Sequence, residues 1–116
     1  MDIQYKNNKI RNICTDLTSA KKKINIYSEK LHSLINVIEN AKTLKDIDAM
    51  RIYYLHKINK DEFALDIAGR RVPWRLIIIP LDEKRDRWKT NDINIIYKST
   101  KALIIWEVSK HYEKYY

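Results

Sequence analysis

The residues of this sequence best suited to chemistry are the arginines of a predicted β-hairpin that runs from Phe63 to Pro80. Arg70 and Arg71 lie in its turn, and Arg75 follows Trp74 at the start of the second strand. The planar guanidinium group donates paired hydrogen bonds that match a phosphate. Phosphate binding is therefore the first chemistry that this hairpin suggests.

The charge of the chain agrees with an anionic partner. The 116 residues include 23 Lys and Arg against 15 Asp and Glu, a formal net charge of +8. A basic surface attracts phosphate by long-range Coulomb forces and releases counterions, as in nucleic-acid binding. Solvated, lysine-rich helix faces explain the same charge equally well. The run from Lys21 to Lys23 fits either interpretation, because it can contact RNA phosphate or an acidic partner, or simply face solvent.

Composition argues against several classes of protein and site. No stretch approaches the roughly 20 apolar residues of a membrane span, and the first residues lack the apolar run of a signal peptide. We therefore expect a cytoplasmic protein with no membrane partner. The single Cys14 has no cysteine partner for a disulfide or a thiolate zinc site, and the three histidines are too scattered for a metal motif. We expect neither a metal nor a cofactor.

The predicted hairpin has two faces of different character. Runs of alternating apolar residues at 63–68 and 74–79 predict its strands, and Pro80 is expected to end the second. Placing Leu65 opposite Leu76 makes one face wholly apolar, and we expect that face to meet a long helix. That face consists of Phe63, Leu65, Ile67, Trp74, Leu76 and Ile78. On the other face, Asp66 then lies opposite Arg75, so Arg75 either meets a ligand or pairs with Asp66 to stabilise the sheet.

Periodicity predicts helices before the hairpin. A short strand at 2–6 precedes a helix that begins at Lys9 and buries Cys14. A long helix, capped by Thr18-Ser19, continues to about Ala41. Thr43 and Asp46 have the spacing of a capping box, which predicts a short helical turn at 44–49.

After the hairpin, residues 81–92 predict a surface loop in which Trp88 packs back on the sheet. Residues 93–97 fit a strand or a helix. The run 101–108 predicts a central strand because both of its faces are apolar. One face carries Ala102, Ile104, Trp106 and Val108, and the other carries Leu103, Ile105 and Glu107. The whole chain, 1–116, predicts a single α+β domain.

Three segments, in this order, carry a resemblance to a known family. They are MDIQYKNNKIRNICTD, LHKINKDEFALDIAGRRVPWRLIIIP and KALIIWEVSKHY. Together they resemble the RelE/HigB toxin superfamily, and within it the HigB-like toxins described as plasmid maintenance system killer proteins. The resemblance covers nearly the whole chain.

This resemblance implies a RelE-like fold, with two N-terminal helices packed on one face of a small, mainly antiparallel twisted sheet. It implies the toxin of a type II toxin-antitoxin system, a ribosome-dependent endoribonuclease that cuts translated mRNA. Its partners would be the ribosome, mRNA and a helix-turn-helix antitoxin similar to HigA. Operator DNA would be bound only through the complex with that antitoxin.

The resemblance indicates five residues as candidates for catalytic roles. Arg75 corresponds to the family's arginine after an aromatic residue and would stabilise the phosphate. The basic loop is shorter here and leaves Lys57 or Lys60 to bind the phosphate or to act as the base. His111 or Tyr112 would be the acid, although their order is the reverse of the family's. Structural roles in the loop and in a packed tail explain these four residues as well.

Further residues would bind RNA. Arg70 and Arg71 lie in a hairpin turn that is longer than the family's, and Lys110 ends the last strand. They join Lys57 and Lys60 as cations for the RNA backbone.

Two other functions are kept open by the departures from the family pattern. One is a toxin of the same fold that is not a nuclease and binds a protein target such as gyrase. The other is a basic nucleic-acid-binding module without catalytic activity.

Overall fold

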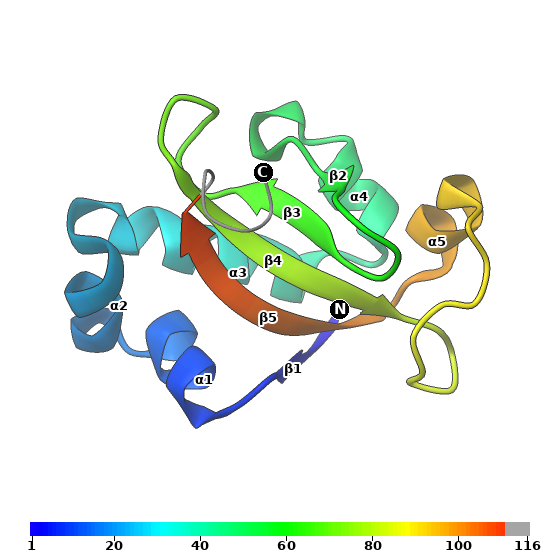
Figure 1. The fold of residues 1–116 in the computed structure, drawn as a ribbon, viewed down its shortest axis with the longest axis horizontal. Helices are drawn as coiled ribbons and strands as arrows, with labels where there is room; N and C mark the ends of the chain where they lie inside the picture. Colours follow the sequence, from blue (N-terminus) through cyan, green and yellow to red (C-terminus); the bar gives the residue numbers. More distant parts are fainter. Residues whose placement is uncertain (111–116) are drawn as a thin grey trace.

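The computed structural model describes residues 1–110 as one sheet with helices packed on one of its faces (Figure 1). In chain order, the elements are β1 (Asp2–Tyr5), α1 (Asn8–Thr15), α2 (Leu17–Ile24), η1 (Asn25–Tyr27), α3 (Ser28–Asn40), α4 (Leu44–Asp48), η2 (Arg51–Tyr53), β2 (His56–Lys57), β3 (Phe63–Asp66), β4 (Trp74–Leu81), α5 (Ile93–Ser99) and β5 (Ala102–Lys110). The predicted α+β class is confirmed.

The sheet has five strands in the order β1-β5-β4-β3-β2. Strand β1 runs parallel to β5, and the other neighbours are antiparallel. Strand β5 therefore lies between two partners, as its apolar faces predict. The short strand at the start of the chain is also confirmed.

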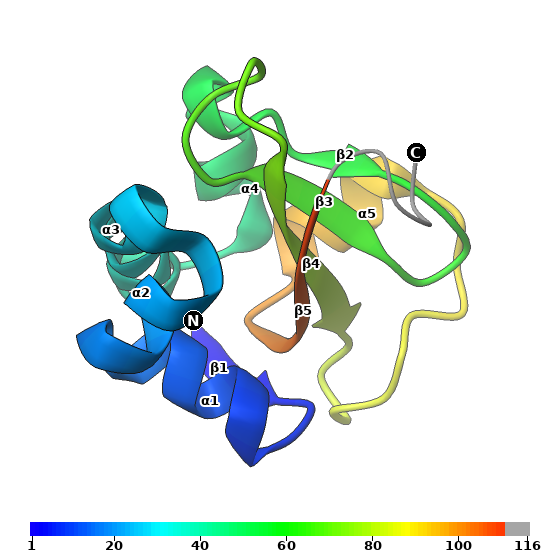
Figure 2. The ribbon, with the colours of Figure 1, turned by 60° about the vertical axis from the view of Figure 1, so that its left-hand side comes forward.

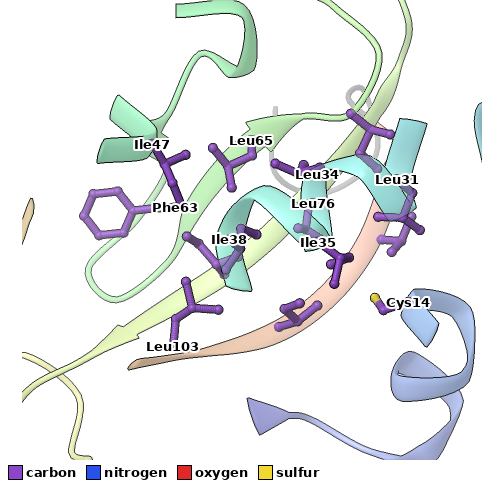
Figure 3. Close-up of a cluster of buried hydrophobic side chains, with 14 of the residues drawn as sticks. Cys14, Leu31, Leu34, Ile35, Ile38, Ile47, Phe63, Leu65, Leu76 and Leu103 are labelled. Carbon is purple, nitrogen blue, oxygen red and sulfur yellow. The ribbon is translucent and has the colours of Figure 1, made fainter. Parts of the chain in front are cut away.

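The predicted register of the hairpin is confirmed. Phe63 lies opposite Ile78, Leu65 opposite Leu76, and Asp66 opposite Arg75. The apolar face packs on α3, whose side chains Leu31, Leu34, Ile35 and Ile38 point toward the sheet (Figure 3). We call this the helix face of the sheet, and the opposite one the outer face.

The prediction that Pro80 ends its strand is wrong. Strand β4 continues to Leu81, and Pro80 lies opposite Leu103 of β5. Pairing with β3 stops at Ile78. At Pro80 the strand therefore has β5 as its only sheet neighbour, and a residue without an N–H group is tolerated on an unpaired edge.

The predicted alternation in β5 is wrong beyond Ile105, because a β-bulge interrupts the pairing with β4. Ile77 lies opposite Glu107, whereas the next residue, Ile78, lies opposite Ile105. Trp106 is the extra residue. Val108 consequently joins Leu103 and Ile105 in the core on the helix face, whereas Glu107 shares the outer face with Ile77.

The predicted long helix is broken at Asn25, where φ is 53° and ψ is −118°. Helix α2 ends at Ile24, and α3 begins at Ser28 after the single turn η1. The predicted cap of this helix is also wrong, because the side chain of Asp16 accepts the hydrogen bond from the backbone of Ser19. The spacing of apolar residues is the same on both sides of Asn25, so the hydrophobic periodicity of the sequence does not reveal the break.

Other local predictions are confirmed. Thr43 and Asp46 form the capping box of α4. The indole Nε1 of Trp88 donates to Thr100 Oγ1 at 2.9 Å, so this ring packs back on the protein. Residues 93–99 form helix α5, capped by Asp92, which resolves the strand-or-helix ambiguity. No helix within residues 1–110 has the length and apolar composition needed to cross a lipid bilayer.

The break at Asn25 generates a prediction about stability. Its backbone angles are those of the first central position of a type II′ turn, where glycine is favoured. Asn25→Gly should raise the free energy of unfolding by about 1 kcal/mol, because the strain of a side chain there disappears. Urea unfolding monitored by circular dichroism checks this. Asn25→Ala is the control and should destabilise, and equal stabilities of the three proteins would contradict the assignment.

Burial of Cys14 generates a second prediction. Desolvation raises the pKa of its thiol from 9.0 to about 12. The unfolded chain therefore loses this proton first, and the stabilisation is lost as the pH rises from about 9 to 12. Cys14→Ala should be less stable than the original chain at pH 8, and the difference should shrink by pH 11. Urea unfolding at both pH values measures the difference, and a gap that widens would contradict the burial.

Candidate functional site

The outer face of the sheet carries polar side chains in two rows. Residues directly opposite one another in an antiparallel sheet point to the same side. One row runs His56, Ala64, Ile77, Glu107, and the next runs Asp66, Arg75, Ser109. This face is turned toward the viewer in Figure 1, with α3 behind the sheet.

The central feature of the second row is a buried ion pair. Arg75 Nε lies 2.8 Å from Asp66 Oδ1, and the two side chains are 4% and 0% exposed. Arg75 Nη1 donates to the carbonyl oxygens of Val72 and Trp74, and Nη2 donates to that of Arg70 at 3.1 Å. Each guanidinium nitrogen thus has a protein acceptor. The structural role expected for Arg75, pairing with Asp66, is present, and the same side chain also holds the hairpin turn.

The two candidate lysines do not lie beside Arg75. Lys57 is half-buried and opposite Phe63, a residue of the helix face, so Lys57 and Arg75 point to opposite sides of the sheet. Lys60 is exposed in the loop before β3. Arg75 pairs with the last residue of β3, whereas Lys60 precedes the first. The structure therefore separates both lysines from Arg75.

Arg70 takes part in an exposed stack of three side chains. Its guanidinium carbon lies 4.2 Å from the centre of the Tyr54 ring. On the same ring, the His56 imidazole stacks with a centroid distance of 4.5 Å and an interplanar angle of 29°. Tyr54 is 41% exposed. Because cation, phenol and imidazole come together here, we name Arg70, Tyr54 and His56 the cation–aromatic stack.

The backbone fixes the orientation of His56. Tyr54 has left-handed angles, φ 46° and ψ 56°, at the end of η2. Its carbonyl oxygen lies 2.8 Å from His56 Nδ1. A carbonyl oxygen can only accept, so Nδ1 carries the hydrogen and Nε2 is the basic nitrogen of the neutral ring. His56 was not among the residues that the sequence indicated, because its position against Tyr54 depends on this left-handed backbone.

Of the four remaining candidates, two lie within the described residues and two lie outside them. Arg71 is exposed in the hairpin turn beside Arg70. Lys110 lies opposite Trp74 on the helix face, with its Nζ atom 5.5 Å from the indole centre. His111 and Tyr112 lie outside the described residues, so their role as the acid stays a prediction. Within residues 1–110, no group of three or more His, Cys, Asp or Glu side chains gathers as metal ligands would.

Comparison with known proteins gives no relative on which to base an activity. No protein-family model, no curated protein and no solved structure matches this chain.

The ion pair generates a prediction about stability. Asp66→Asn removes the charge that compensates buried Arg75 and should lower the free energy of unfolding by about 3–5 kcal/mol. The double variant Asp66→Leu with Arg75→Met should be less destabilised, because it leaves no uncompensated charge. Urea unfolding of the three variants checks this order. A loss below about 1 kcal/mol for Asp66→Asn would contradict the structural role of the pair.

Proposed function

We propose that this chain is a metal-independent endoribonuclease that acts as the toxin of a type II toxin-antitoxin system. Its substrate is translated mRNA on the ribosome, and a helix-turn-helix antitoxin similar to HigA neutralises it. The observation that supports this chemistry best is the cation–aromatic stack of Arg70, Tyr54 and His56. The net charge of +8 favours an RNA partner over an uncharged one.

The stack supplies two of the groups that RNA cleavage needs. His56 Nε2 accepts the proton of the ribose 2′-hydroxyl, and the 2′-oxygen attacks phosphorus. The bond to the 5′-oxygen breaks, which leaves a 2′,3′-cyclic phosphate. Arg70 donates hydrogen bonds to the phosphate oxygens as their charge grows, and the Tyr54 ring holds Arg70 and His56 next to each other. His111 or Tyr112 delivers the proton to the leaving 5′-oxygen.

Arg75 has a different part in this proposal from the one that the resemblance implies. Its side chain is buried, and it binds the carbonyl oxygen of Arg70 at 3.1 Å. It therefore acts as a positioning residue, which fixes the backbone from which Arg70 reaches the phosphate. Lys60 and Arg71 are exposed and serve as contacts for the RNA backbone.

Two substitutions test the stack. His56→Asn keeps a donor near the Tyr54 carbonyl oxygen but removes the basic Nε2, so mRNA cleavage should fall about 10²- to 10⁴-fold. Arg70→Gln removes the phosphate donor and should lower it about 10²- to 10³-fold. Induced expression at equal protein levels, followed by transcript-end mapping and growth measurement, gives the result.

Arg11→Gln is the matched control. Arg11 is an exposed residue of α1, and its guanidinium carbon is 5.7 Å from the Tyr5 ring centre. Its loss removes one positive charge and one cation–π contact far from the stack, so cleavage should be unchanged. Undiminished cleavage by His56→Asn would refute the proposed base. Intact mRNA with blocked DNA replication would instead indicate a toxin that binds a protein target such as gyrase, and intact mRNA without growth arrest would indicate a binding module.

A further inference from the structure

A basic groove lies between α1 and α2, away from the cation–aromatic stack. Its volume is about 300 Å³, and its lining comes from both helices. The lining residues are Lys9, Asn12, Ile13, Ser19, Lys22 and Lys23. Figure 2 shows α1 and α2 beside each other on the helix side of the sheet. The groove is thus a concave surface with three ammonium groups.

The charge of this groove is largely uncompensated. Lys9, Lys22 and Lys23 are exposed, and none of them forms a salt bridge in the part of the chain that the structure describes. The nearby carboxylate of Asp16 already accepts from the backbone and the hydroxyl of Ser19. These hydrogen bonds lower its pKa first, and His32 and Lys22 lower it further. Asp16 is therefore engaged in capping α2.

Lys23 connects the groove to an aromatic residue of the sheet. Its Nζ atom lies 5.6 Å from the centre of the Trp74 ring, and Lys110 Nζ lies 5.5 Å from the same centre. Trp74 is only partly buried. A partly buried ring with two cations near it, next to a basic groove, combines the two features that bind single-stranded nucleic acid.

We propose that the groove and Trp74 form a second RNA-binding surface, which holds the phosphodiester backbone beside Lys9, Lys22 and Lys23 and stacks a base on Trp74. The identity of the polymer as RNA rests on the proposed function. The hairpin turn carries Arg70 of the cation–aromatic stack and leads directly to Trp74 of this surface. An acidic polypeptide would satisfy the lysines but would have no use for the accessible part of the indole, so the ring favours nucleic acid.

The test measures binding of a fluorescent 2′-O-methyl oligouridine of 12 nucleotides by anisotropy over a series of salt concentrations. This probe has no 2′-hydroxyl and is not cleaved. The triple variant Lys9→Gln, Lys22→Gln, Lys23→Gln should weaken binding at least 10-fold. It should also reduce the slope of log affinity against log salt by about 2, since each phosphate contact to a single strand contributes about 0.7. Trp74→Leu should weaken binding about 5- to 100-fold.

A second triple variant is the matched control. Lys42→Gln, Lys45→Gln, Lys98→Gln removes the same charge from exposed positions around α4 and α5 and should change affinity less than 3-fold. Equal losses in both triple variants would overturn the proposal, because net charge alone would then explain binding. Stronger competition by polyaspartate than by oligouridine of equal charge would also overturn it and indicate an acidic protein partner.

Failure of this inference is distinguishable from failure of the proposed function. The groove variant is judged by oligouridine binding, whereas His56→Asn is judged by mRNA cleavage in cells. If the groove variant binds normally while His56→Asn is inactive, the groove proposal fails and the nuclease proposal stands. If the groove variant binds weakly while His56→Asn still cuts, the catalytic assignment fails and the groove stands.

Discussion

The buried ion pair between Asp66 and Arg75 is the interaction on which the hairpin end of the molecule depends. Two opposite charges removed from water must compensate each other, because the loss of either one leaves an unpaired charge inside the protein. Arg75 uses its other nitrogens to bind carbonyl oxygens of the turn from Arg70 to Trp74. The Arg75 side chain therefore connects Asp66 on the outer face to the backbone of the hairpin turn. Arg70, which lies in that turn, contacts the Tyr54 ring.

The hairpin end of the molecule places cations next to two different aromatic rings, Tyr54 and Trp74. Arg70 of the hairpin turn contacts the Tyr54 ring, whereas Trp74 at the end of the same turn contacts Lys23 and Lys110. Tyr54 follows the short helix η2 directly, and Trp74 is the first residue of β4. The arginine and lysine side chains next to these rings are long and have many rotamers. They can therefore adjust to the phosphates of a flexible anionic polymer.

Sequence patterns predicted those parts of the fold that depend on local pairing. Alternation in the hairpin determined the register because a one-residue slip would expose every core side chain, and the spacing of Thr43 and Asp46 determined the cap of α4. The break at Asn25 was missed, since apolar spacing continues through it. For the candidate site, residue type identified Arg70 and Arg75. The stack of His56 on Tyr54 was missed because it depends on the left-handed backbone of Tyr54. The side of the sheet to which Lys57 points was also missed, because it depends on the pairing of β2, a strand of two residues.

The bulge at Trp106 has a consequence for the shape of the whole sheet. Between the pairs Ile78–Ile105 and Ile77–Glu107, β5 uses one more residue than β4 to cover the same distance. An extra residue in one of two paired strands bends that strand and increases its local twist, and β5 is visibly curved in Figure 1. The bend of β5, and with it the shape of the sheet, therefore follows from a difference in residue count between two paired strands, whichever side chain occupies the extra position.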